Sequence, residues 1–109
     1  MFARILNFQV KEEKKEEFVK LFKNQVLPIL KNQIGFLEVL PFFPEKMTKE
    51  EKVCTVSLWA TKMDAERYER EAYNKAYDIL KPCITGMVEV KNHNLETVIC
   101  QHFVETLVA

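Results

Sequence analysis

The chain has 109 residues, of which 48% are hydrophobic and 29% are charged, and its 16 basic residues balance 16 acidic ones. These proportions predict one globular domain over residues 1–109 and exclude an intrinsically disordered chain. The balanced charge offers no field to attract nucleic acid or an anionic membrane, and no stretch approaches the roughly 20 apolar residues of a membrane span.

The glycine and cysteine counts exclude further classes of protein. Two glycines are too few for the glycine-rich loop of a Rossmann fold or a P-loop. Three widely spaced cysteines without a CxxC pattern indicate free thiols, and with no export signal visible they favour a cytoplasmic protein. A metal site built from His93, Cys100 and His102 lacks further converging ligands, so we expect no metal.

The first third of the chain predicts a strand followed by a helix. Residues 2–10 have a period of two with apolar residues on both parities, which is typical of a strand covered on both sides, and Arg4 is an exception on one parity. Residues 11–33 carry one apolar stripe on a charged helix. Pro28 should kink this helix or end its regular part, and Gly35 should follow its end.

The middle of the chain predicts two strands and a second helix. Residues 36–43 form a strand whose prolines place it at a sheet edge or in a bulge, and residues 53–59 form a strand rich in β-branched side chains. Thr61 is the predicted N-cap of the second helix, with Asp64 in a capping-box position. This helix should continue to about Leu80.

We read residues 82–94 as a loop, residues 96–104 as the last strand and residues 105–109 as a tail. The resulting order, βαββαβ, predicts an α+β ferredoxin-like fold, with a four-stranded antiparallel sheet and two helices on one face. Because the strands are apolar on both parities, the second face also needs a cover. A twin subunit is the simplest cover, so we expect a homodimer whose two sheets enclose a barrel.

Three stretches of the chain resemble the antibiotic biosynthesis monooxygenase family of dimeric α/β barrels. Residues 7–18 are similar to the family's first strand passing into a charged helix. Residues 34–37 are similar to its entry into the second strand, with Ile34 in place of proline. Residues 57–68 resemble its E-x-W strand end and following helix, with Ser57 in place of glutamate. The resemblance extends over almost the whole chain.

The resemblance implies an oxygenase that uses no metal or flavin, because a hydroquinone or phenol-like substrate supplies the electrons. Such chemistry needs removal of a phenolic proton, donors that stabilise the anion, and a dry cavity. The candidate catalytic residues are Asn7 as a donor, Tyr68 as a donor in the pocket wall, and His102 as a base. Asn7 can instead bond across the dimer, and a lone strand histidine such as His102 is often structural.

Further candidates are contacts for a small aromatic substrate. They are Ser57, Trp59, Tyr73 and Tyr77. Packing between helix and sheet explains the three aromatic residues of this set equally well.

Two other functions remain open at the level of sequence. One is a non-catalytic dimer that binds a small ligand or a partner. It is favoured because this chain has Ser57 where family members often have Glu, and Tyr68 where many members have His. The other is haem binding or degradation, with His102 to ligate iron. The haem-degrading branch combines an Asn, a Trp and a His. Asn7 matches the first, whereas Tyr68 stands at the second and Tyr77 or Asp78 lies near the third.

Overall fold

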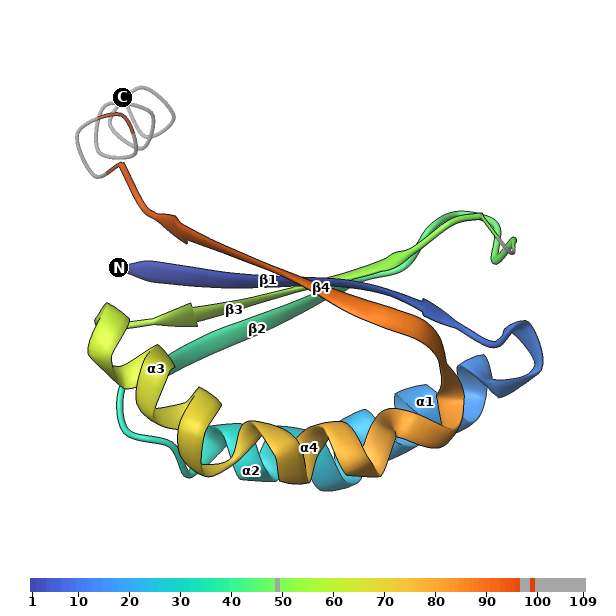
Figure 1. Cartoon of the computed structure of the whole chain (residues 1–109), viewed down its shortest axis with the longest axis horizontal. Coiled ribbons are helices and arrows are strands. Elements are labelled where there is room, and N and C mark those ends of the chain that lie inside the picture. The colour runs from blue at the N-terminus through green and yellow to red at the C-terminus, as the bar shows by residue number, and fades with distance from the viewer. Residues whose placement is uncertain (49, 97–98, 100–109) are drawn as a thin grey trace, which may run out of the picture.

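The structure, a computed structural model, describes residues 1–48, 50–96 and 99 (Figure 1). Its strands are β1 (Phe2–Val10), β2 (Phe36–Phe42), β3 (Val53–Trp59) and β4 (Ile84–Asn94). Its helical segments are η1 (Glu12–Lys14), α1 (Lys15–Leu21), η2 (Phe22–Val26), α2 (Leu27–Lys31), α3 (Lys62–Glu71), α4 (Tyr73–Leu80) and η3 (Lys81–Cys83).

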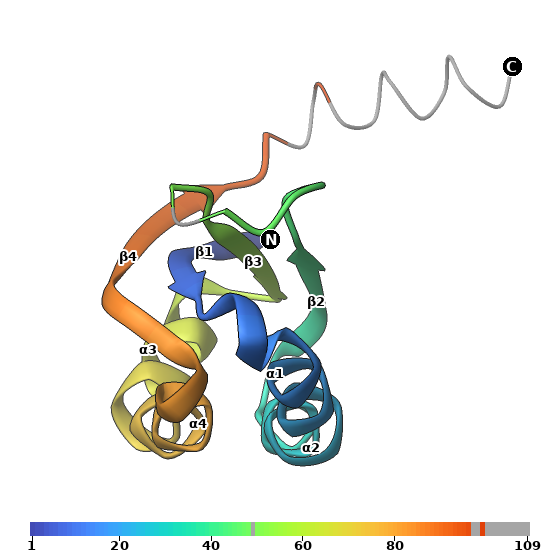
Figure 2. The ribbon, with the colours of Figure 1, turned by 90° about the vertical axis from the view of Figure 1, so that its right-hand side faces the viewer.

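The four strands form one antiparallel sheet in the order β2-β3-β1-β4. The helices lie side by side against one face of this sheet (Figure 2). We call α1 and α2, with η2 between them, the first helical layer, and α3 and α4 the second helical layer. The predicted ferredoxin-like α+β fold is therefore confirmed. No helix among the described residues is long and apolar enough to cross a membrane.

The first helical layer contains a π-helical turn in front of Pro28. The N–H of Leu27 donates to the carbonyl of Phe22, five residues back, within η2. Proline has no N–H to offer the preceding turn and its ring crowds that turn, so a wider turn accommodates it. The regular α-helix is thus interrupted in front of Pro28, and Phe22 and Val26 line the space between the helices and the sheet.

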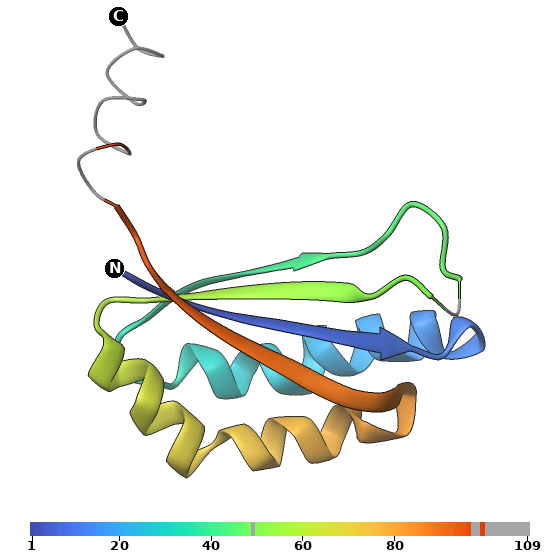
Figure 3. The same ribbon diagram turned by 45° about the horizontal axis from the view of Figure 1, so that its top comes forward.

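The second predicted helix is two helices, because the chain turns at Ala72. There φ is −135° and ψ is −17°, although the Ala72 N–H still donates to the Tyr68 carbonyl at 2.9 Å. The axis changes direction between α3 and α4 (Figure 3). The predicted N-cap is confirmed, since the Asp64 N–H donates to the Thr61 hydroxyl at 3.1 Å.

The predicted loop at 82–94 is wrong, because residues 84–94 form β4. The strand predicted at 96–104 falls mostly outside the described residues, and neither Glu96 nor Ile99 is in a strand. A bulge interrupts the alternation of side chains along β4, because residues 86–88 lie opposite the single residue Phe8. The strand was therefore not recognised from a pattern of period two. Gly86 takes a φ of +76° in this bulge, a conformation that suits glycine.

Alternation along the strands divides the sheet into two chemically different faces. The even-numbered side chains of β1 and the odd-numbered side chains of β3 face the helices, and most of them are buried. The largest fully buried residues on this side include Trp59 and Phe18. We call the opposite side the outer face; it carries the odd-numbered residues of β1 and the even-numbered residues of β3, which are half-buried.

Candidate functional site

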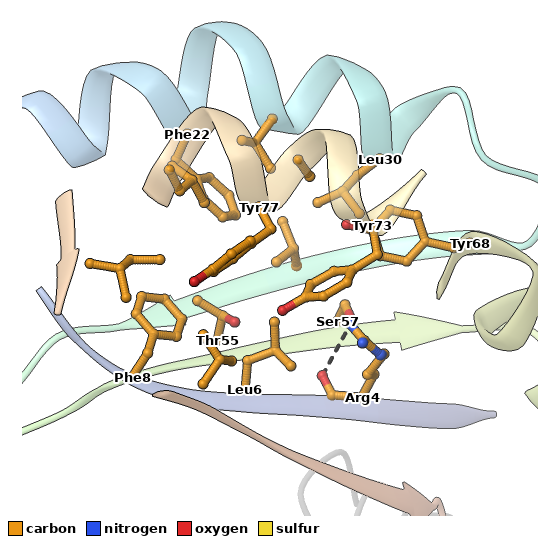
Figure 4. Close-up of a pocket in the computed structure, with 16 residues that line it drawn as sticks. Arg4, Leu6, Phe8, Phe22, Leu30, Thr55, Ser57, Tyr68, Tyr73 and Tyr77 are labelled. Atoms are coloured by element: carbon orange, nitrogen blue, oxygen red, sulfur yellow. Dashed lines mark hydrogen bonds between the residues drawn. The ribbon is translucent and has the colours of Figure 1, made fainter. Parts of the chain in front are cut away.

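A cavity of about 50 Å³ lies between the helix-facing side of the sheet and the two helical layers (Figure 4). Its wall is mostly apolar, with contributions from β1, β2, β3, β4, η2, α2, α3 and α4. The polar side chains in the wall are Arg4, Thr55, Ser57, Tyr68, Tyr73 and Tyr77. The wall contains no carboxylate and no histidine among the described residues. Its polar chemistry is therefore one guanidinium, three phenols and two small hydroxyls.

Arg4 lines the cavity, although we did not select it from the sequence as a candidate site residue. It is a charged side chain on the apolar parity of β1, and it is 2% exposed. Its Nε has no hydrogen-bond partner among the described residues, and its Nη2 lies 3.9 Å from the half-exposed carboxylate of Glu69. A buried charge is costly unless it is well paired. Arg4 thus retains donor capacity inside the protein.

The guanidinium of Arg4 lies against aromatic rings. It is 4.4 Å from the centre of the Tyr73 ring and 5.9 Å from that of Tyr68. Such cation–π contacts partly compensate for lost hydration. Tyr73 projects from α4 toward β1, with its hydroxyl directed at the sheet side of the cavity (Figure 4).

The three tyrosines form a continuous aromatic row along the second helical layer. Tyr68 stacks on Trp59 with ring centres 5.1 Å apart, Tyr73 meets Tyr68 edge-on at 6.2 Å, and Tyr77 stacks on Tyr73 at 6.1 Å. Burial raises the pKa of Tyr68 to about 12, and burial also raises the pKa of Tyr73 against the opposing effect of Arg4. Both phenols are therefore neutral near pH 7 and able to donate a hydrogen bond.

The predicted candidates Ser57 and Trp59 are tied to one another. The Ser57 hydroxyl accepts a hydrogen bond from the Trp59 indole at 3.0 Å and donates to the Arg4 carbonyl at 3.2 Å. Trp59 is fully buried and is not part of the cavity wall. Trp59 therefore supports Tyr68 from behind, whereas Ser57 lies in the wall with its only proton already engaged.

The structure separates Asn7 from the cavity. Asn7 pairs with Cys54 of β3 and Glu89 of β4, and the alternation of β1 places its side chain on the outer face. Its neighbours Leu6 and Phe8 line the cavity instead. Asn7, which we selected as a donor to the substrate, therefore does not point into the cavity between sheet and helices.

The remaining predicted groups do not join the cavity. His102 and Cys100 lie outside the described residues. His93, which we placed in a loop, is an exposed residue of β4 paired with Ala3. In the described ranges, no three His, Cys, Asp or Glu side chains come close enough to share a metal ion.

The size of the cavity limits what it holds in this conformation. A volume of about 50 Å³ accommodates a few water molecules, whereas drug-sized ligands occupy about 300–1,000 Å³. Tyr73 and Tyr77 fill much of the space between Arg4 and the surface, and both are half-buried. The cavity in this conformation is therefore smaller than an aromatic ligand requires.

The sequence profile of the antibiotic biosynthesis monooxygenase family matches residues 1–78 of this chain. The protein belongs to this family. The matched stretch includes β1, the first helical layer, β2, β3, α3 and most of α4, and it contains every predicted site residue except His102. The resemblance noted in the sequence is thus confirmed for the greater part of the chain.

Solved structures of low sequence identity share the fold of this family member. SnoaB, a cofactor-independent oxygenase from Streptomyces nogalater, is 14% identical with a TM-score of 0.71, over 87% of this chain and 92% of SnoaB. MhuD, a haem degrader from Mycobacterium tuberculosis, is 19% identical with a TM-score of 0.70, over 88% of this chain and 96% of MhuD. A conserved protein from Methanosarcina mazei is 18% identical with a TM-score of 0.67, over 88% and 94% of the respective chains. No curated protein sequence matches this chain.

Proposed function

We propose that this protein is a cofactor-independent monooxygenase that oxidises a small phenol or quinol with O₂ inside each subunit of a homodimer. Membership of the monooxygenase family supports the reaction class. The observation that carries the proposal is the buried guanidinium of Arg4, which lies in a mostly apolar cavity beside neutral tyrosines. This arrangement suits a substrate that must become an anion before it reacts.

The proposed reaction balances without a resident cofactor. A phenol with a free ring position and O₂ give the corresponding quinone and water. One oxygen atom forms the new carbonyl, and the other leaves as water with the phenolic proton and the ring hydrogen. The substrate is the reductant, so the protein has to stabilise the phenolate and exclude solvent.

Each wall group has a role in this scheme. Arg4 stabilises the phenolate, because an opposite charge within a few ångströms favours the ionised form of an acid. Tyr68 and Tyr73 remain protonated and donate to oxygen atoms of the substrate or of reduced O₂. The apolar side chains of β1 and η2, such as Leu6 and Phe22, keep water away from the reactive intermediate.

The homodimer is part of the proposal because the outer face of the sheet is apolar and has no cover among the described residues. Leu40 and Phe42 of β2 are 41% and 56% exposed there, beside the half-buried Val56 and Leu58 of β3. A second copy that buries the same face closes the sheet pair into a barrel. Asn7 then lies at the contact between subunits, where its amide bonds across the dimer.

Oxygen uptake with a panel of hydroquinones and naphthols tests the reaction. We expect uptake with at least one compound, a large loss in Arg4→Met, and full activity in Met63→Ala, whose side chain is 70% exposed on α3. Quinone formed and O₂ consumed should be equimolar. Uptake at the buffer rate for every compound would contradict the proposal.

A second function is favoured by the small cavity and by the absence of a carboxylate or histidine from its described wall. In that case the protein binds an aromatic ligand without changing it. Recovery of the bound compound unaltered after aerobic incubation would support this alternative. The buried Cys83 and half-buried Cys54 are both free thiols, which fits a cytoplasmic location for either function.

A further inference from the structure

The charge state of the ligand can be argued from the surroundings of Arg4. The titratable groups that face its guanidinium are Tyr68 and Glu69 from α3 and Tyr73 from α4, with Tyr77 next in the cavity wall. Of these only Glu69 carries a negative charge, and its side chain is 50% exposed at 3.9 Å. The buried cation is thus balanced by one half-exposed carboxylate at the long end of ion-pair distance.

The donors of Arg4 exceed the partners that this conformation provides. A guanidinium has five N–H donors, and the Nε of Arg4 is buried with no partner among the described residues. Tyr73 covers the face of the guanidinium: its ring attracts the cation, and a side-chain hydrogen bond with Arg4 opposes the rise in the Tyr73 pKa. An anionic oxygen that replaced this ring would satisfy both the charge and the free donor.

The environment would make such a replacement strongly favourable. The wall around Arg4 is mostly apolar, so a charge pair there is screened much less than one in water. Tyr73 is half-buried on α4 and follows the turn at Ala72, where the helix axis already changes. Rotation of its side chain toward solvent would uncover the guanidinium without moving the sheet.

We propose that the cavity binds its phenolic ligand as the anion, with the ionised oxygen against the Arg4 guanidinium in the place that the Tyr73 ring now occupies. The ligand class is therefore a single-ring or fused-ring phenol whose hydroxyl is acidic, such as one conjugated to a carbonyl or nitro group. The inference rests on the proposed function for the location of the ligand. It does not depend on turnover.

The test uses 4-nitrophenol, a single-ring phenol that ionises near neutral pH and turns yellow as the anion. Titrating the ligand with the full chain at several pH values gives the pKa of the bound phenol from its absorbance. We expect binding to lower this pKa by about one unit or more, since an opposite charge at contact distance lowers the pKa of an acid by 1–3 units. The methyl ether 4-nitroanisole, which cannot ionise, should bind at least tenfold more weakly at neutral pH.

Two variants test whether the shift in the pKa of the ligand comes from Arg4. Arg4→Met should abolish the shift in ligand pKa and bring the two compounds to similar affinity. Glu69→Gln alters a half-exposed residue and removes the competing carboxylate, so we expect it to strengthen binding of the anion about two- to fivefold and to lower the ligand pKa further. A circular dichroism spectrum and melting curve for each variant verify that it is folded.

The outcomes are decisive in either direction. An unshifted or raised pKa for bound 4-nitrophenol, equal binding of the methyl ether, or no binding at millimolar ligand would overturn the proposal. A lowered pKa together with no oxygen uptake by any phenol would uphold anion binding and refute the oxygenase. Oxygen uptake that is unchanged in Arg4→Met would uphold the oxygenase and refute the role of Arg4.

Discussion

Asp64 at the start of α3 packs directly against Gly35, so that a Cβ at position 35 would overlap its carboxylate. Gly35 follows the first helical layer with a φ of +81°, and its carbonyl accepts the Ala60 N–H at 2.8 Å. This contact joins the loop before β2 to the end of β3 and to the start of α3. It therefore fixes where the tyrosine-bearing helices begin.

Gly35→Ala should destabilise the protein more than Gly86→Ala does. Both glycines have positive φ, which costs an alanine about 1–2 kcal/mol, but the space around Gly86 is open. We expect Gly35→Ala to lose at least about 1 kcal/mol beyond the loss in Gly86→Ala, because Asp64 must also move. Urea unfolding of the two variants measures the difference. Equal losses would show that the Asp64 contact is unimportant.

The stability of the protein should fall at alkaline pH because of Tyr68. Its pKa is about 12 in the folded protein, against about 10 for an unfolded chain. The folded state holds the proton more tightly, so this contribution is complete below about pH 10 and is lost as the pH rises through about 12. The loss from Tyr68 alone is about 2–3 kcal/mol across this window.

Urea unfolding at several pH values checks this prediction, with Tyr68→Phe as the comparison. Tyr73 acts in the same direction, because burial also raises its pKa, so Tyr68→Phe should still lose some stability at alkaline pH. The wild type should lose more stability than Tyr68→Phe over the same pH range, and the difference is the contribution of Tyr68. The same decline in both proteins would show that the Tyr68 proton is not held more tightly on folding.

Arg4 should be dispensable for stability even though it is buried. An incompletely paired buried charge is often replaced by an apolar side chain of similar size without loss. We expect Arg4→Met to unfold within about 1 kcal/mol of the wild type, as the lost cation–π contact with Tyr73 is offset by the removed desolvation cost. Thermal and urea unfolding measure this. A loss of several kcal/mol would mean that the guanidinium is a structural group.

The sequence predicted those parts of the fold where alternation and caps act locally. β1 and β3 appear at the predicted residues because every second side chain of each faces the helices and most of these side chains are buried. The turn at Ala72 has no proline or glycine to mark it, and the bulge at residues 86–88 interrupts the alternation that marks β4. Both features depend on packing between distant segments, which local patterns do not report.

Candidate residues on α3, α4 and β3 line the cavity, whereas on β1 the sequence reading selected Asn7 and missed Arg4. Tyr68, Tyr73 and Tyr77 line the cavity as expected for one face of a helical pair. Asn7 was selected by residue type, although its parity on β1 is that of the outer face. Arg4 has the parity of the buried side chains, and a charge at such a position was the available signal for a functional residue.

The outer face should hold the dimer together, and a charge at its centre should separate the subunits. Val56 lies in the middle of β3, flanked by Ile5 of β1 and Leu40 of β2, and it is half-buried in one chain. In a face-to-face dimer it would be buried completely, so Val56→Asp would place an unpaired carboxylate in an apolar contact. Sedimentation velocity should show a dimer for the wild type and a monomer for Val56→Asp.

Met63→Asp is the matched control, because it adds the same charge at an exposed apolar residue of α3 and should remain dimeric. A monomeric wild type, or a Val56→Asp variant that stays dimeric, would show that this face is not the contact and that its apolar residues have another cover.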